Sequence, residues 1–107
     1  MQAWEKLALV SGIARKMEAW GMKISHAHVW RKRAEIMACQ PAQLWAVLDC
    51  IGAAPEAELR ATYGEYPLKI SGTVNGVEIY CCGSKADYET IEQMKKNKEA
   101  RKEWTNP

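Results

Sequence analysis

The side chains best suited to chemistry gather in one stretch, residues 25–39, which reads SHAHVWRKRAEIMAC. It holds two histidines, three consecutive cations and a cysteine. At 100° per residue, most of its apolar side chains fall on one arc of a helix and most of its polar ones on the other, with His26 and Arg33 intruding on the apolar arc. Ser25 suits the N-cap, because its hydroxyl can accept from first-turn amides. The stretch therefore predicts one helix with a packing side and a basic side.

The histidines and cysteines do not predict a metal site. On a helix, His26 and His28 lie about 200° apart and cannot share an ion. Cys81 and Cys82 are adjacent in an expected strand, so they point to opposite faces. The sequence also contains no CxxC spacing.

The sequence does not predict a catalytic site either. Cys50 lies in an apolar segment without a basic residue nearby, whereas a reactive thiolate needs an electropositive setting. Cys39, beside the cations, is a faint candidate. Paired carboxylates and glycine-rich phosphate loops cannot be identified. We therefore expect neither an enzyme nor a cofactor.

Hydrophobic periodicity predicts the elements that must position these residues. Apolar residues recur at helical spacing in several segments, which Gly21, Pro41, Gly52 and Gly64 separate. Asn75-Gly76 between alternating apolar residues predicts a hairpin that pairs Val74 with Val77. The expected helices span 3–20, 25–39, 41–51, 56–63 and 85–103, and the hairpin spans 68–82. The predicted fold class is mainly α (α+β): a compact helical domain of four or five helices with one antiparallel β-hairpin.

The last helix is expected to leave the domain. Ser84 and Asp87 resemble a capping box at its start. Its apolar stripe ends at Met94, and lysines occupy the positions that should continue it. We therefore expect a single domain over 1–94 and a charged, partly projecting extension over 95–107.

Composition sets further limits. The chain has 107 residues, an apolar fraction of 48% and a net charge of only +2, so its bulk charge does not argue for nucleic acid. It has no apolar run long enough for a membrane span and no usual signal-peptide layout. Its four cysteines are expected to stay reduced, which places the protein in the cytoplasm.

Binding is the function that the sequence favours. A polar, basic helix after a short glycine-containing turn is an arrangement that enters the major groove of DNA, where cations contact phosphates. The candidate contacts in the first half of the chain are Lys23, Ser25, His26, His28, Arg31, Lys32 and Arg33. A second positive edge consists of Lys95, Lys98 and Lys102.

Residues 13–52 resemble the helix-turn-helix regulators of the phage repressor and activator type. The resemblance lies in Ile13-Ala14, in Gly21 at the turn, in Trp30 followed by three cations, and in the later segment 44–49, LWAVLD. It implies a small regulator of transcription that binds double-stranded DNA and that could do so as a homodimer.

A protein partner is the alternative. The same basic surface could engage an acidic protein, which would make the chain an adaptor or inhibitor. The near-neutral net charge, the mixed charges of the last helix and the unpartnered Trp104 favour this reading.

Overall fold

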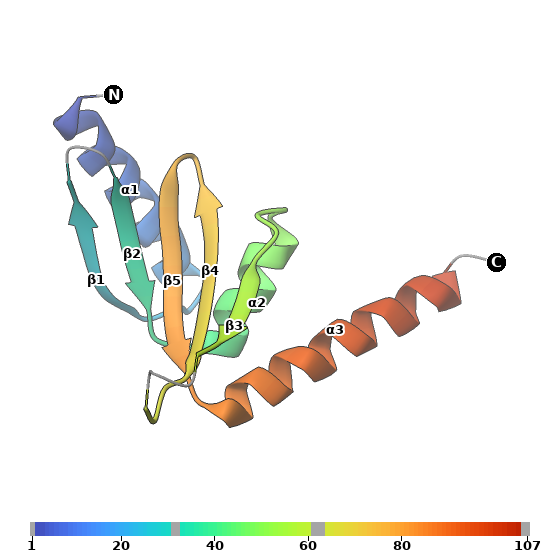
Figure 1. Cartoon of the computed structure of the whole chain (residues 1–107). Coiled ribbons are helices and arrows are strands. Elements are labelled where there is room, and N and C mark those ends of the chain that lie inside the picture. Colours follow the sequence, from blue (N-terminus) through green and yellow to red (C-terminus); the bar gives the residue numbers. More distant parts are fainter. Residues whose placement is uncertain (1, 31–32, 61–63, 106–107) are drawn as a thin grey trace.

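A five-stranded mixed sheet backed by helices forms the centre of the molecule (Figure 1). The computed structural model describes residues 2–30, 33–60 and 64–105, with side chains up to residue 100. The described elements, in chain order, are α1 (Ala3–Ala19), β1 (Ile24–Val29), β2 (Ala34–Ala38), α2 (Pro41–Cys50), β3 (Glu56–Leu59), β4 (Leu68–Val74), β5 (Val77–Gly83) and α3 (Lys85–Thr105). Among these residues there are thus three helices, which corrects the prediction of a mainly helical fold with a single hairpin.

The strands lie in the order β1-β2-β5-β4-β3. All neighbours are antiparallel except β2 and β5, which run parallel, with Ala34 opposite Val77. Both α1 and α2 lie on one face of the sheet, which we call the helix face. α1 packs against β1 and β2, and α2 packs against β4 and β5; both helices lie behind the sheet in the view of Figure 1. We call the opposite side of the sheet the open face.

The core lies between the helix face and the helices. Strand residues alternate between buried and partly exposed along β2, β4 and β5, as expected of strands covered on one side. Helices α2 and α3 complete this core through Leu44, Leu48 and Ile91. Gly72 lets α2 approach β4, since a Cβ there would lie 3.0 Å from Leu48 Cδ1.

Several predicted elements are confirmed. Helix α1 ends before Gly21, whose φ of +84° is the left-handed conformation of a C-terminal cap. Pro41 begins α2, where its missing N–H costs nothing. The β4–β5 hairpin has the expected register around Asn75-Gly76, where both residues have positive φ, as a type I′ turn requires.

The predicted helix over 25–39 is wrong. It holds the antiparallel pair of β1 and β2 instead, and residues 31 and 32 of the predicted helix lie outside the described residues. Ala34, Ile36 and Ala38 are all buried, so the period is two and not 3.6. β2 lies between β1 and β5 in the sheet. The stabilisation from burying its apolar side chains there outweighs the local preference for a helix. Residues 13–52 therefore hold α1, β1, β2 and α2, not successive helices.

The predicted helix over 56–63 is also wrong. Residues 56–59 form β3, and residues 61–63 lie outside the described part of the chain. β3 pairs with β4 from Glu56 opposite Ser71 to Leu59 opposite Leu68. The acids that suggested a first helical turn lie instead on an edge strand, where charge is well tolerated.

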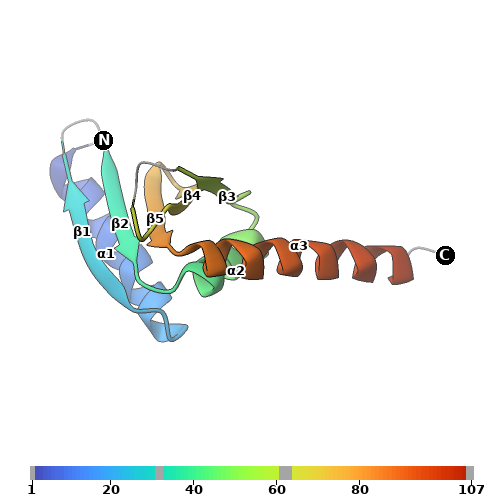
Figure 2. The ribbon, with the colours of Figure 1, turned by 60° about the horizontal axis from the view of Figure 1, so that its bottom comes forward.

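Helix α3 starts against the core and then leaves it (Figure 2). Asp87 accepts hydrogen bonds from both the backbone N–H and the hydroxyl of Ser84, and Asp87 N–H donates to Ser84 Oγ, so the expected cap is confirmed. Residues 96–100 are exposed. The radius of gyration is 15.0 Å, above the roughly 13 Å of a compact chain of this length. No helix in the described part of the chain has the length and apolar character needed to cross a membrane.

Candidate partner-binding surfaces

A bulge in β1 decides where the two histidines point. Ile24 pairs with Ala38, but His26 pairs with Met37, so Ser25 is an extra residue in the strand. Because side chains alternate along a strand, this extra residue lets Ile24 face the helices while the histidines face the open side. Without it, all three would point the same way.

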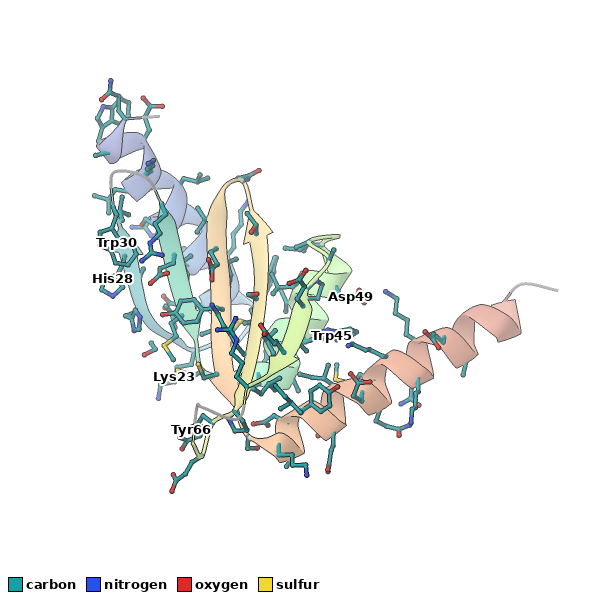
Figure 3. All side chains as sticks on the ribbon, viewed as in Figure 1. Lys23, His28, Trp30, Trp45, Asp49 and Tyr66 are labelled. Carbon is teal, nitrogen blue, oxygen red and sulfur yellow. The ribbon has the colours of Figure 1, made fainter. Side chains whose placement is uncertain are left out.

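The open face carries a row of rings along β1. The ring centroids of His26 and His28 are 4.7 Å apart, edge to face, and His28 stacks on Trp30 at 5.1 Å. The Arg33 guanidinium lies 4.7 Å from the centroid of Trp30. His28 and Trp30 lie together at this edge of the sheet (Figure 3). The hairpin thus unites four of the predicted contact residues, Ser25, His26, His28 and Arg33, although not on a helix.

Tyr80 continues the row toward the middle of the sheet. Its hydroxyl lies 3.2 Å from His26 Nε2, and Lys69 Nζ lies 5.4 Å from its ring centroid. Burial raises the pKa of Tyr80 above its usual value, and the nearby charge of Glu35 raises it further. The ring therefore stays neutral at physiological pH.

The part of the open face between β3 and β4 holds more acids than cations, and most of these charges are paired. A hollow of about 430 Å³ between β3 and β4 is lined by three carboxylates and two cations. Lys69 pairs with Glu78 at 3.4 Å, and Arg60 pairs with Glu58 at 3.0 Å. The hydrogen bond from Arg60 lowers the pKa of Glu58. Because these charges are paired within the site, the hollow offers little unbalanced charge to an ionic ligand.

The lysines predicted as a second positive edge lie far from the hairpin. Lys98 Nζ contacts Asp49 Oδ2 at 2.7 Å, and Lys95 contacts Glu92 at 3.1 Å. Asp49 lies on α2, across the sheet from His28 and Trp30 (Figure 3). Lys95 and Lys98 are thus paired with neighbouring acids and do not extend the basic surface.

Three of the remaining predicted contacts are not described, and the fourth stands apart from the ring row. Arg31 and Lys32 lie outside the described residues, and the side chain of Lys102 is not described. Lys23 is exposed just before β1, where its backbone N–H donates to Gln40 Oε1 at 2.9 Å.

The helix layer contains an apolar groove of about 230 Å³ between α1 and α2, which we call the α1–α2 groove. Its lining residues are Ile13, Lys16, Met17, Trp20, Leu44, Val47, Leu48, Ile51, Val74, Asn75 and Ile79. Trp20 is 50% exposed and Ile51 is 46% exposed, so the groove has a large apolar side chain on each wall. Gln43 Nε2 donates to Trp20 O at 3.4 Å, which joins the two walls.

A smaller hollow of about 120 Å³ continues along α1 toward the β1–β2 hairpin, and we call it the Lys6 hollow. It is lined by Lys6, Leu9, Arg33, Ala34, Asn75, Gly76 and Val77. Asn75 lines both hollows, which places them next to each other. Lys6 Nζ donates to Trp30 O at 3.5 Å and so lies close to the hairpin.

Sequence reasoning missed this groove because it treated every apolar helix position as core. The stripe on α1 is wider than the sheet can cover, and Trp4 and Leu7 remain 71% and 61% exposed. Trp45, expected at the edge of the stripe on α2, is instead buried. The excess of large apolar side chains on α1 and α2 was the available signal.

The histidines, cysteines and acids of the described residues are spread over the fold. Within them, no three His, Cys, Asp or Glu side chains come together in a way that could hold a metal ion. His26 and His28 do lie side by side, which corrects their expected separation. Cys81 is buried and Cys82 is not, so their predicted placement on opposite faces is confirmed, and all four cysteines are free thiols.

Comparisons with protein families, with curated proteins and with solved structures find no match to this chain.

Proposed function

We propose that this chain is a non-enzymatic protein-binding module and that its helix layer receives a segment of the partner. The α1–α2 groove, open between Trp20 and Ile51, is the observation that carries this proposal. Tryptophan is enriched among residues that dominate binding energy, and large exposed apolar patches mark interaction sites. The four free thiols support a cytoplasmic setting.

The charges support a protein partner over nucleic acid. Phosphate binding needs cations that release counterions, and Lys98 and Lys95 are already paired with acids. The predicted alternative of an adaptor thereby becomes the leading function, although its surface moves from the expected helix to the groove.

Selection from a displayed library of random peptides, each about 15 residues long, tests this function, because a helix of that length spans about 22 Å at 1.5 Å per residue. Peptides recovered on the whole chain are measured against the double variant Trp20→Ser/Ile51→Ser. We expect affinity to fall at least about tenfold, because both apolar walls are lost.

The matched control is Trp4→Ser/Leu7→Ser, which removes two apolar side chains of α1 that are even more exposed and do not line the groove. It should leave peptide affinity unchanged. If no peptide is recovered, or if the recovered peptides bind the groove variant as well as the original chain, the proposed function is wrong.

Nucleic-acid binding is a second candidate, and the ring row with Arg33 supports it. Rings along β1 and an arginine just before β2, next in the sequence to the cations at positions 31 and 32, are a suitable combination for bases and phosphates. Labelled single-stranded and duplex DNA at two salt concentrations tests it. Binding should weaken steeply with salt and should fall in Trp30→Ala/Arg33→Ala, whereas no binding in low salt removes this candidate.

A further inference from the structure

We propose that His26 and His28 form a chelating site for a late divalent transition metal, with Cu²⁺ bound more tightly than Ni²⁺ or Zn²⁺. The site lies on the open face of the sheet, so it depends neither on the α1–α2 groove nor on the proposed function. The two imidazoles are its protein ligands, and water or an external ligand completes the coordination of the metal.

The strand brings together two histidines that the expected helix would have kept apart. Residues two positions apart on a strand face the same side, and the ring centroids of His26 and His28 are 4.7 Å apart. The whole sequence contains two histidines. Every imidazole that the chain can offer to a metal therefore lies at this one place.

The separation of the two rings suits a shared ion. A metal at about 2.0–2.1 Å from a ligating nitrogen lies about 3.2 Å from the centroid of that imidazole. Two rings on one ion therefore have centroids about 4.5 Å apart at a right angle and about 5.2 Å apart at the tetrahedral angle. The observed separation of 4.7 Å falls between these two values.

The ring planes must turn before both ligating nitrogens can point at one ion, because the rings meet edge to face with an angle of 65° between their planes. The turn is a rotation about the Cβ–Cγ bond, a torsion with broad preferences in histidine. The axis of this bond passes close to the ring centroid, so the nitrogens can converge while the centroids stay nearly in place. A turn of His28 would exchange its stacking on Trp30 for the bond to the metal.

Tyr80 provides a partner for the second nitrogen of His26. A metal-bound imidazole commonly donates its other ring N–H to an oxygen, which fixes the tautomer and the orientation of the ring. The Tyr80 hydroxyl lies 3.2 Å from His26 Nε2, so Nε2–H can donate to it. Nδ1 then becomes the ligand atom, since its neighbour, Ser25 Oγ, lies 3.5 Å away, which is long for a hydrogen bond.

The chemistry of the ligands selects the class of metal. Imidazole suits copper, nickel and zinc, and the affinity of divalent ions for such ligands reaches its maximum at Cu²⁺. Mg²⁺ and Ca²⁺ instead require oxygen ligands. Within the described residues no third histidine, cysteine or acid joins the pair, so positions on the metal remain open to an external ligand.

The charges around the site have both signs. Glu35 lies opposite His28 in the pairing of β1 with β2, and its carboxylate favours a cation on this part of the sheet. The Arg33 guanidinium, 4.7 Å from the ring centroid of Trp30, acts in the opposite direction. We therefore expect the binding energy to come mainly from the two nitrogen–metal bonds.

Titration of the untagged chain with Cu²⁺ tests the site. The background carries Cys39→Ser/Cys50→Ser/Cys82→Ser, because the less buried thiols would themselves bind or reduce copper. Calorimetry should show one Cu²⁺ per chain, and electron paramagnetic resonance should show two imidazole nitrogens on it. Affinity should fall at least about tenfold in His28→Ala, and Mg²⁺ should not bind.

The matched control is Ala27→His/His28→Ala, which keeps two histidines in β1 but places them on opposite faces of the strand. Position 27 is exposed, so it can accept the ring. Copper affinity should fall as far as in His28→Ala, and circular dichroism checks that both variants are folded. The inference is wrong if this variant binds Cu²⁺ as tightly as its background, if a single imidazole nitrogen is detected, or if no Cu²⁺ binds.

Tyr80→Phe tests the part assigned to the phenol hydroxyl. In the Zn²⁺-bound chain, nitrogen NMR should identify Nδ1 of His26 as the ligand atom. Loss of the hydroxyl should make both ring nitrogens of His26 serve as ligand and should lower Zn²⁺ affinity about tenfold. An unchanged ligand atom together with unchanged affinity would show that Tyr80 does not position the ring.

Discussion

Two adjacent cysteines in β5 differ in their chemistry because neighbouring strand residues face opposite sides of the sheet. Cys81 lies in the core, and burial raises its pKa to about 12. Cys82 lies on the partly exposed open face. A single step along the chain therefore separates an inert thiol from an accessible one.

Alkylation by iodoacetamide at pH 8 should separate the four thiols. With a pKa of about 12, only about one Cys81 thiol in ten thousand is ionised at that pH, and the side chain is also shielded. Cys39 and Cys50, which are exposed, should react first, and Cys81 only after unfolding. Peptide mass spectrometry after timed quenching measures this order. Modification of Cys81 at the rate of Cys39 would show that the β5 core is open in solution.

At the scale of elements, the bulge at Ser25 determines which side of β1 reaches a partner. Deleting Ser25 should force either Ile24 out of the core or both histidines into it. We expect the free energy of unfolding to fall by about 2 kcal/mol or more, because apolar burial is lost or polar rings are buried. Chemical denaturation measures this change.

Ser25→Ala is the control, since it keeps the extra residue and removes only the hydroxyl. Its effect should stay within about 0.5 kcal/mol, as for other exposed positions. Equal stability of the deletion and the original chain would mean that β1 shifts its register freely.

Elements fixed by local chemistry were predictable from the sequence. Asn75-Gly76 sets the β4–β5 turn, and Gly21 and Pro41 bound helices whose apolar spacing is unambiguous. β1 and β2 were not predictable in this way. Ala34, Ile36 and Ala38 alternate, but Ala34 and Ile36 also fit a helical arc together with Val29 and Met37, and short apolar runs are ambiguous. The strand that decides the matter, β5, lies far along the sequence.

For the candidate site too, local sequence predicted some features and contacts between distant segments determined the others. His26, His28 and Arg33 were singled out as candidate contacts, but the two histidines were expected on different sides of a helix. Their proximity comes from the strand and its bulge, which the helical pattern did not predict. The groove depends on how far apart α1 and α2 lie on the sheet, and no local pattern contains that distance. Trp20 and Ile51 were therefore assigned to the core although about half of each remains exposed.

At the scale of the whole molecule, the C-terminal part of α3 extends the shape more than it stabilises the fold. Ending the chain after Lys98 should change the free energy of unfolding by less than about 1 kcal/mol, because residues 96–100 are exposed and surface ion pairs contribute little. Thermal and chemical denaturation measure this difference.

Ile91→Ala provides the contrast in the same helix. Ile91 is fully buried, so its truncation should cost about 2–5 kcal/mol. A large loss of stability on removal of the end of α3 would indicate that this part of the helix packs against the domain in solution.

The parallel contact between β2 and β5 has a consequence for the order of folding. The strand pairs β1–β2 and β4–β5 each join segments that are close in the sequence, so they can form early. The parallel pairing of β2 with β5 joins distant segments, such as Ala34 and Val77, and forms more slowly. Until then β2 carries an unpaired backbone edge whose Ala34, Ile36 and Ala38 side chains are uncovered, a template for pairing with another nascent chain. During synthesis on the ribosome, the pairing of β2 with β5 is therefore the last strand pairing of the sheet to form.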